Sequence, residues 1–87
     1  MIENFPKLKE GEVALLRAET LTGHILDEQL ELAVNDSQKT YTVINSSDEA
    51  LSVAKNLIAG RSDIECVIYG KDKEVFYFLN SQNIGAK

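Results

Sequence analysis

Cys66 is the single cysteine of this 87-residue chain, and a thiolate there could act as a nucleophile or a metal ligand. Such a cysteine needs a lowered pKa, supplied by a cation, a histidine or a helix N-terminus. Its sequence neighbour Glu65 is instead an acid, which opposes ionisation. Cys66 also lies inside the apolar run IECVIY, where a free cysteine packs as a small hydrophobic residue. We therefore predict that Cys66 is buried and does no chemistry.

His24 is the only histidine, and a metal site built on it would take Asp27 and Glu28 as its nearest acidic ligands. In a helix these three side chains would share one side, whereas in a strand or loop they do not converge. An exposed turn residue after Gly23 is the favoured interpretation. The chain also lacks a Ser–His–Asp order and a glycine-rich phosphate loop. We expect no enzymatic activity, no cofactor and no metal.

Aromatic side chains in the segment EVFYFL are the strongest functional signal. Phe76 and Phe78 are two residues apart, so in a strand they would lie on one face, beside Val67 and Tyr69 of the preceding strand. These four residues are the predicted interaction face. RNA-binding sheets use aromatic residues at the same spacing, but their glycine-basic signature is absent here. For the rings themselves, the first interpretation is that an N-terminal element covers them as part of the core, the second is an exposed protein interface, and nucleic-acid binding is a distant third.

Length and charge restrict the class of protein. The chain fits one domain over residues 1–87, with a frayed tail at 80–87. Nine basic against fourteen acidic residues give a net charge of −5, which disfavours nucleic acids and anionic membranes as partners. No apolar run approaches the ~20 residues of a membrane span, and the N-terminus lacks the pattern of a signal peptide. We expect a small soluble cytoplasmic protein of bacterial type, without an internal disulfide.

A helix predicted over residues 47–59 is the clearest element. Ser46 and Glu49 have the spacing of a capping box, in which the serine accepts a hydrogen bond from a first-turn amide. Gly60 is expected to end the helix in the left-handed conformation. Apolar residues recur on one helical stripe, which predicts one buried face: Ala50, Leu51, Ala54, Leu57 and Ile58.

A β-hairpin is predicted after the helix, from IECVIYG and EVFYFL around a turn at 70–73. Pairing Tyr69 with Glu74 points Cys66 toward the helix, opposite Tyr77. The same register places Phe76 beside Val67 and Phe78 beside Glu65. Because a carboxylate favours water, Phe78 is expected to be more exposed and Phe76 to be covered.

A second hairpin is predicted before the helix, from QLELAV and TYTVI around a turn at 35–38. Residues 26–34 could form a helix instead, and the residues at 12–20 leave helix and strand equally open. The predicted fold is therefore α+β. It consists of an antiparallel or mixed sheet of two β-hairpins with one capped helix (47–59) packed on one face, plus an N-terminal element at 12–20.

Three functional hypotheses follow from these observations, and no motif identifies a family. The favoured one is a non-enzymatic interaction module whose aromatic sheet face binds a protein partner or another copy of itself. The alternative is a small acidic inhibitor or immunity-type protein that blocks a basic site on a toxin or nuclease through charge complementarity. The third is an enzyme or metal protein built around His24.

Overall fold

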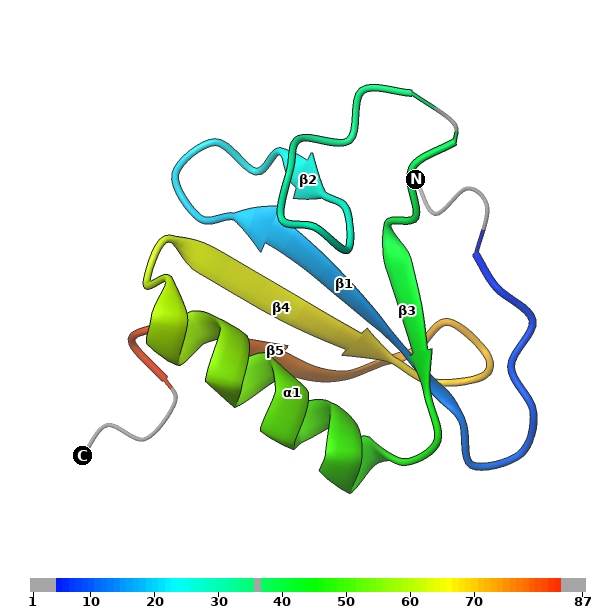
Figure 1. Cartoon of the computed structure of the whole chain (residues 1–87). Coiled ribbons are helices and arrows are strands. Elements are labelled where there is room, and N and C mark those ends of the chain that lie inside the picture. The colour runs from blue at the N-terminus through cyan, green and yellow to red at the C-terminus, as the bar shows by residue number, and fades with distance from the viewer. Residues whose placement is uncertain (1–4, 36, 84–87) are drawn as a thin grey trace.

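One antiparallel sheet and one helix make up the fold, which the computed structural model describes over residues 5–35 and 37–83. The strand order is β2-β1-β4-β5, and β3 also pairs with β1. The helix α1 (Ser47–Gly60) crosses one face of the sheet (Figure 1). The five strands are β1 (Val13–Glu19), β2 (Ile25–Leu26), β3 (Tyr41–Ile44), β4 (Ile64–Tyr69) and β5 (Val75–Leu79). The predicted α+β class is confirmed, and none of the helices in the described residues is long and apolar enough to cross a membrane.

The central strand is β1, which is paired along both of its edges. One edge pairs with β4, from Ala14 opposite Tyr69 to Glu19 opposite Ile64. The other edge is shared by β3, which pairs with residues 13–16, and by β2, which pairs with residues 17 and 18. The segment 12–20 therefore contains a strand. Several of its residues favour helix by intrinsic propensity, but pairing and burial on both sides outweigh that preference.

The hairpin predicted before the helix is wrong, because β3 pairs with β1 instead of with the segment preceding it. The carboxylate of Asp27 redirects the chain. It accepts hydrogen bonds from the backbone N–H groups of Gln29 (2.9 Å) and Glu31 (3.0 Å). It also accepts one from the side-chain amide of Gln38 at 2.7 Å. These bonds fold residues 27–31 into a compact turn directly after β2, so no long strand forms there.

The hairpin predicted after the helix forms, but its register differs from the predicted one. Cys66 lies opposite Leu79 instead of Tyr77. This shift by two residues preserves which β4 side chains face the helix, because side chains alternate with a period of two. The turn at 70–73 is closed by a hydrogen bond from the Lys73 N–H to the Gly70 carbonyl at 3.0 Å. Lys73 has a φ of 67°, in the left-handed region.

The core lies between α1 and the sheet, as predicted. Ala50, Ala54 and Ile58 are the buried residues of the helix. Cys66 is fully buried at 0% exposure, which confirms its place in the apolar wall that the helix covers. The buried strand residues in the same cluster are Val13, Leu15, Leu26, Ile44, Ile64, Ile68 and Leu79.

Both ends of α1 have local caps. Ser46 Oγ accepts a hydrogen bond from the Glu49 N–H at 3.1 Å, which confirms the predicted N-cap. The helix ends at Gly60, but without the left-handed conformation predicted for it, since Gly11 and Gly23 are the glycines with positive φ in the described residues. Arg61 is extended instead, and its N–H donates to the Leu57 carbonyl at 3.0 Å.

The tail predicted at 80–87 lies partly outside the described residues, because residues 84–87 are not among them. Residues 80–83 form a hydrogen-bonded turn. The Asn80 N–H donates to Asn83 Oδ1 at 2.8 Å, and the Asn83 N–H donates to Asn80 Oδ1 at 3.1 Å. This turn follows β5 directly and closes its end.

We expect Ser46→Ala to lower the free energy of unfolding by ~1 kcal/mol, because the Glu49 amide loses its acceptor at the helix N-terminus. Ser52→Ala is the matched control, since Ser52 is exposed within the same helix. Chemical denaturation of both variants measures the difference. An equal effect of the two substitutions would show that the cap contributes nothing specific.

Candidate functional site

The sheet face opposite α1 carries three of the four predicted interaction residues. Val67 lies between its ladder partners Leu16 in β1 and Phe78 in β5. Tyr69 follows two residues along β4, opposite Ala14, and therefore points to the same side. Phe78 is 47% exposed, while Val67 and Tyr69 are partly buried. We call this surface the open face.

Phe76 is displaced from this group by a β-bulge. Ile68 lies opposite Tyr77, but the next residue, Tyr69, lies opposite Val75, so Phe76 is the extra residue of β5. Two neighbouring side chains, Phe76 and Tyr77, thus oppose the single residue Ile68. Val75 takes the position beside Tyr69 that the predicted register gave to Glu74. The sequence reasoning missed Val75 because nothing in the turn residues signals the bulge.

The ring of Phe76 lies on the helix side of the sheet, against Gly70. A Cβ atom built on Gly70 would come within 2.5 Å of this ring, so the glycine allows the close approach. Phe76 also lines a hollow together with Val13 of the core and Ser47 at the start of α1. It remains 46% exposed, almost the same fraction as Phe78. The expectation that Phe76 is covered is therefore wrong, and the two rings are exposed to almost the same extent.

The N-terminal segment covers one side of the open face. The ring of Phe5 makes edge-to-face contacts with Tyr41 of β3 (5.2 Å between centroids) and with Tyr69 of β4 (5.8 Å). Ala14, on β1 between these strands, is fully buried. Phe78 does not belong to this cluster of Phe5, Tyr41 and Tyr69. The side of the open face next to β5 is thus left exposed.

The strand β5 forms one edge of the sheet, with β4 as its single strand neighbour in the described part of the chain (Figure 1). Four consecutive residues are about half exposed: Val75 (58%), Phe76 (46%), Tyr77 (42%) and Phe78 (47%). The strand contains no charged residue, no proline and no glycine. Edge strands usually carry lysine, proline or inward charges that prevent pairing with other chains. The strand carries none of these side chains, and the bulge at Phe76 is its one protective irregularity.

The thiol of Cys66 is not a nucleophile in this fold. Burial raises the pKa of Cys66 to about 11, with an opposing effect of Arg17 and a smaller raising effect of Glu65. The thiolate is the reactive form, and at neutral pH a thiol with this pKa is almost entirely protonated. Cys66 therefore contributes packing to the wall under α1.

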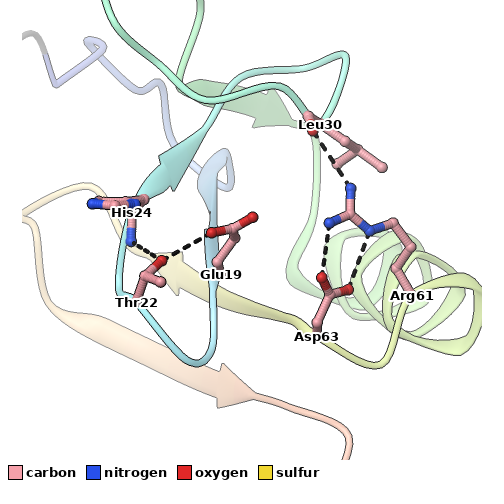
Figure 2. Close-up of polar contacts among 6 residues, drawn as sticks. All are labelled: Glu19, Thr22, His24, Leu30, Arg61 and Asp63. Atoms are coloured by element: carbon pink, nitrogen blue, oxygen red, sulfur yellow. Dashed lines mark hydrogen bonds and ion pairs between the residues drawn. The ribbon is translucent and has the colours of Figure 1, made fainter.

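His24 does not meet the acidic residues proposed as its metal partners. Its backbone N–H donates to Thr22 Oγ1 at 3.2 Å, and the Thr22 hydroxyl donates to Glu19 at 2.9 Å, while the imidazole points away from Glu19 (Figure 2). Asp27 is engaged in its own turn, and Glu28 accepts a hydrogen bond from a threonine of β3. Within residues 5–35 and 37–83, no three His, Cys, Asp or Glu side chains form a metal-binding group.

Arg61 and Asp63 form a bidentate ion pair at the start of β4. The guanidinium Nε and Nη2 donate to the two carboxylate oxygens at 3.1 and 2.9 Å, and Nη1 reaches the Leu30 carbonyl at 3.5 Å (Figure 2). The hydrogen bond from Arg61 holds the pKa of Asp63 below its usual value. Both side chains are partly exposed, so the pair fastens the loop at Leu30 to the end of α1 and forms no enclosed site.

Arg17 is a buried cation that the sequence reasoning missed. It is 3% exposed, on the helix side of β1. Nη1 donates to Thr42 Oγ1 at 2.7 Å and Nη2 to the Thr40 carbonyl at 3.1 Å. The Thr42 hydroxyl donates in turn to Glu28 at 2.8 Å. Desolvation lowers the pKa of Arg17, and the nearby Glu28 carboxylate opposes this effect. Arg17 therefore joins β1 to β3 and to the loop after β2.

Comparisons of the chain with protein-family models, with curated proteins and with solved structures found no match. In the described residues, the uncharged edge strand β5 borders the partly covered open face.

Cys66 should resist thiol-labelling reagents in the native protein and react only after denaturant is added, because the side chain is buried and protonated. Cys66→Ser should cost on the order of 1–3 kcal/mol, since it buries a hydroxyl in an apolar wall. Mass spectrometry of labelled protein at increasing denaturant measures the exposure. Rapid labelling in buffer would contradict the packing of α1 on β4.

Acid should weaken the turn after β2 through Asp27. The amide of Gln38 is the largest cause that lowers the pKa of Asp27, followed by the backbone N–H of Glu31. A carboxyl group with a lower pKa in the folded state stabilises the fold above its unfolded pKa of ~3.9. That contribution is lost as the pH falls through the folded pKa.

We therefore expect the melting temperature of the wild type to fall more steeply than that of Asp27→Asn between about pH 5 and pH 2. Gln38→Ala should show an intermediate slope, because it removes the strongest hydrogen bond to the carboxylate while leaving the backbone ones. Thermal melts across this range measure all three slopes. Parallel curves for the wild type and Asp27→Asn would show that Asp27 does not hold this turn.

Proposed function

We propose that this chain is a non-enzymatic protein-interaction module that binds along the edge of β5 and the adjoining part of the open face. The observation that carries the proposal is the row of four half-exposed apolar residues at 75–78 on an uncharged edge strand. An extended segment of a partner can add a strand to such an edge, with main-chain hydrogen bonds for affinity and side-chain contacts for specificity. Phe78 supplies the aromatic anchor typical of interface centres.

Further features support a binding role over a catalytic one. Cys66 is protonated and buried, and the imidazole of His24 points away from Glu19 (Figure 2). The net charge of −5 disfavours nucleic acid as the partner, so we expect a protein. A lone buried thiol fits the reducing cytoplasm, where we expect this module to act.

An acidic inhibitor of a basic protein is the second candidate function. One observation favours it: a hollow of about 490 Å³ at the N-terminal end of α1 is lined by the carboxylates of Glu10, Glu12, Asp72 and Glu74. Lys71 is the basic residue in its wall, and it reaches Glu10 at 3.6 Å. Carboxylates arranged in this way would attract a basic loop of a toxin or nuclease by charge complementarity.

Phe78→Lys should abolish the capture of a partner from native lysate by the immobilised protein, because it places a charge in the centre of the proposed surface. Leu21→Lys is the matched control, since Leu21 is 93% exposed in the turn after β1, away from β5. Both variants should melt close to the wild type. Equal retention of the partner by Phe78→Lys and by Leu21→Lys would overturn the proposal.

Ionic strength separates the two candidate functions in the same capture experiment. Binding through the apolar edge should persist between roughly 0.1 and 1 M salt, because screening acts on charges and not on buried apolar area. Capture by the acidic hollow should weaken steeply over this range and should be lost in a Glu12→Gln/Asp72→Asn variant.

A further inference from the structure

We propose that the occupant of this edge is a second copy of the chain, which pairs antiparallel with β5 around a two-fold axis at Phe78. We also propose that the side chain of Asn83 opposes this pairing. This inference deepens the proposed function and rests on it. It adds the identity of the partner, the register of the pairing and a residue that opposes it.

The carbonyl group of Phe78 points toward the free side of β5. In an antiparallel ladder, alternate residues direct their N–H and C=O groups toward the neighbouring strand and away from it. The Phe78 carbonyl accepts a hydrogen bond from Asn83 Nδ2 at 3.0 Å, and Asn83 lies in the turn beyond the strand. Phe78 therefore belongs to the residues whose backbone groups are available to a new strand.

Self-pairing at Phe78 keeps the open faces of the two copies on one side of the joined sheet and their helix sides on the other. Two copies of Phe78 would exchange both of their backbone hydrogen bonds and place their rings side by side on the open face. Tyr77 of one copy would lie opposite Leu79 of the other on the helix side, because opposed residues point the same way. The Phe76 bulge lies outside this central triplet and does not interrupt it.

The distribution of charge around β5 suits an antiparallel second copy. The residues before the strand, KDKE at 71–74, are all charged, whereas those after it, NSQN at 80–83, are polar and uncharged. Antiparallel pairing centred on Phe78 directs the charged turn before β5 in one copy toward the uncharged turn after β5 in the other, so like charges are not brought together. A parallel arrangement would instead align each charged residue with its own copy, which is destabilising. An uncharged strand between these ends is complementary to itself.

Asn83 competes with the second copy for the Phe78 carbonyl. Its amide must leave that carbonyl before the N–H of the incoming Phe78 can bind there. Each copy thus loses one hydrogen bond on pairing, and a five-residue edge buries little area compared with standard interfaces. The association is accordingly weak in the wild type and becomes tighter when the Asn83 amide is removed.

Sedimentation of the purified chain from about 10 µM to 1 mM tests the pairing in the range of weak complexes. The wild type should show a monomer–dimer equilibrium, and Asn83→Ala should tighten it roughly tenfold, because the competing hydrogen bonds are gone. Asn83→Asp should tighten it as well, since it keeps the oxygen that accepts from Asn80 but lacks the amide donor. Gln82→Ala is the control that should leave the equilibrium unchanged.

Cross-linking tests the position of the two-fold axis. Opposed residues in a hydrogen-bonded antiparallel pair have Cα atoms about 5.5 Å apart, a distance that a disulfide spans. Phe78→Cys in the Asn83→Ala background should therefore form a covalent dimer under mild oxidation, while Val75→Cys in the same background should not. The native Cys66 is buried and takes no part.

A monomer for both the wild type and Asn83→Ala at all concentrations would overturn the self-pairing. So would a dimer that Phe78→Lys leaves intact, or preferential cross-linking through Val75→Cys. These results leave the proposed function standing if Phe78→Lys still loses its partner in lysate, which would identify the occupant of the edge as a different protein. If Phe78→Lys still captures its partner and still dimerises, both proposals are overturned.

Discussion

Pairing of β1 on both of its edges is the constraint on which the rest of the structure depends. β3 and β4 are each antiparallel to β1, so they run parallel to one another on its two sides. The chain that links them contains α1, and it must therefore cross the sheet above β1 (Figure 1). The buried residues Val13 and Leu15 lie beneath this crossing. The position of the helix, the wall around Cys66 and the outer place of β5 all follow from that arrangement.

Hydrogen bonds of polar side chains hold together the side of the sheet that β2 and β3 form. β2 and β3 are short, and between them the chain makes turns instead of strands. Arg17 joins the central strand to Thr40 and Thr42, and Asp27 joins the loop to Gln38 across 11 residues. A buried guanidinium carries a desolvation cost, and hydrogen bonds of this kind offset it. Such contacts determine the path of the loop more than they add to the stability of the fold.

Sequence patterns predicted the elements whose signals are local. The helix was predictable because its cap joins Ser46 to a residue three positions away, and the hairpin of β4 and β5 because its turn residues lie between two apolar runs. Its register was not, because the left-handed backbone of Lys73 and the bulge at Phe76 leave no signal in residue type. The prediction of a hairpin before the helix failed because the Asp27 carboxylate closes a turn with the amides of Gln29 and Glu31 and also binds the distant Gln38. The alternation of side chains correctly placed Val67 and Phe78 on one face, whereas the role of Arg17 depends on contacts with residues more than 20 positions away.

The two borders of the sheet differ in kind. The β5 border is one strand of five residues with a bulge at Phe76, while the opposite border is divided into β3, with four residues, and β2, with two. An additional strand cannot pair along the whole of this border, because β3 and β2 do not form one straight strand. The sheet can therefore be extended by a further strand at the β5 border, and the proposed pairing of two copies would occupy this border in both. A pair formed in the proposed way would be closed by symmetry, so the asymmetry of the borders would oppose open-ended filaments despite the exposed aromatic strand.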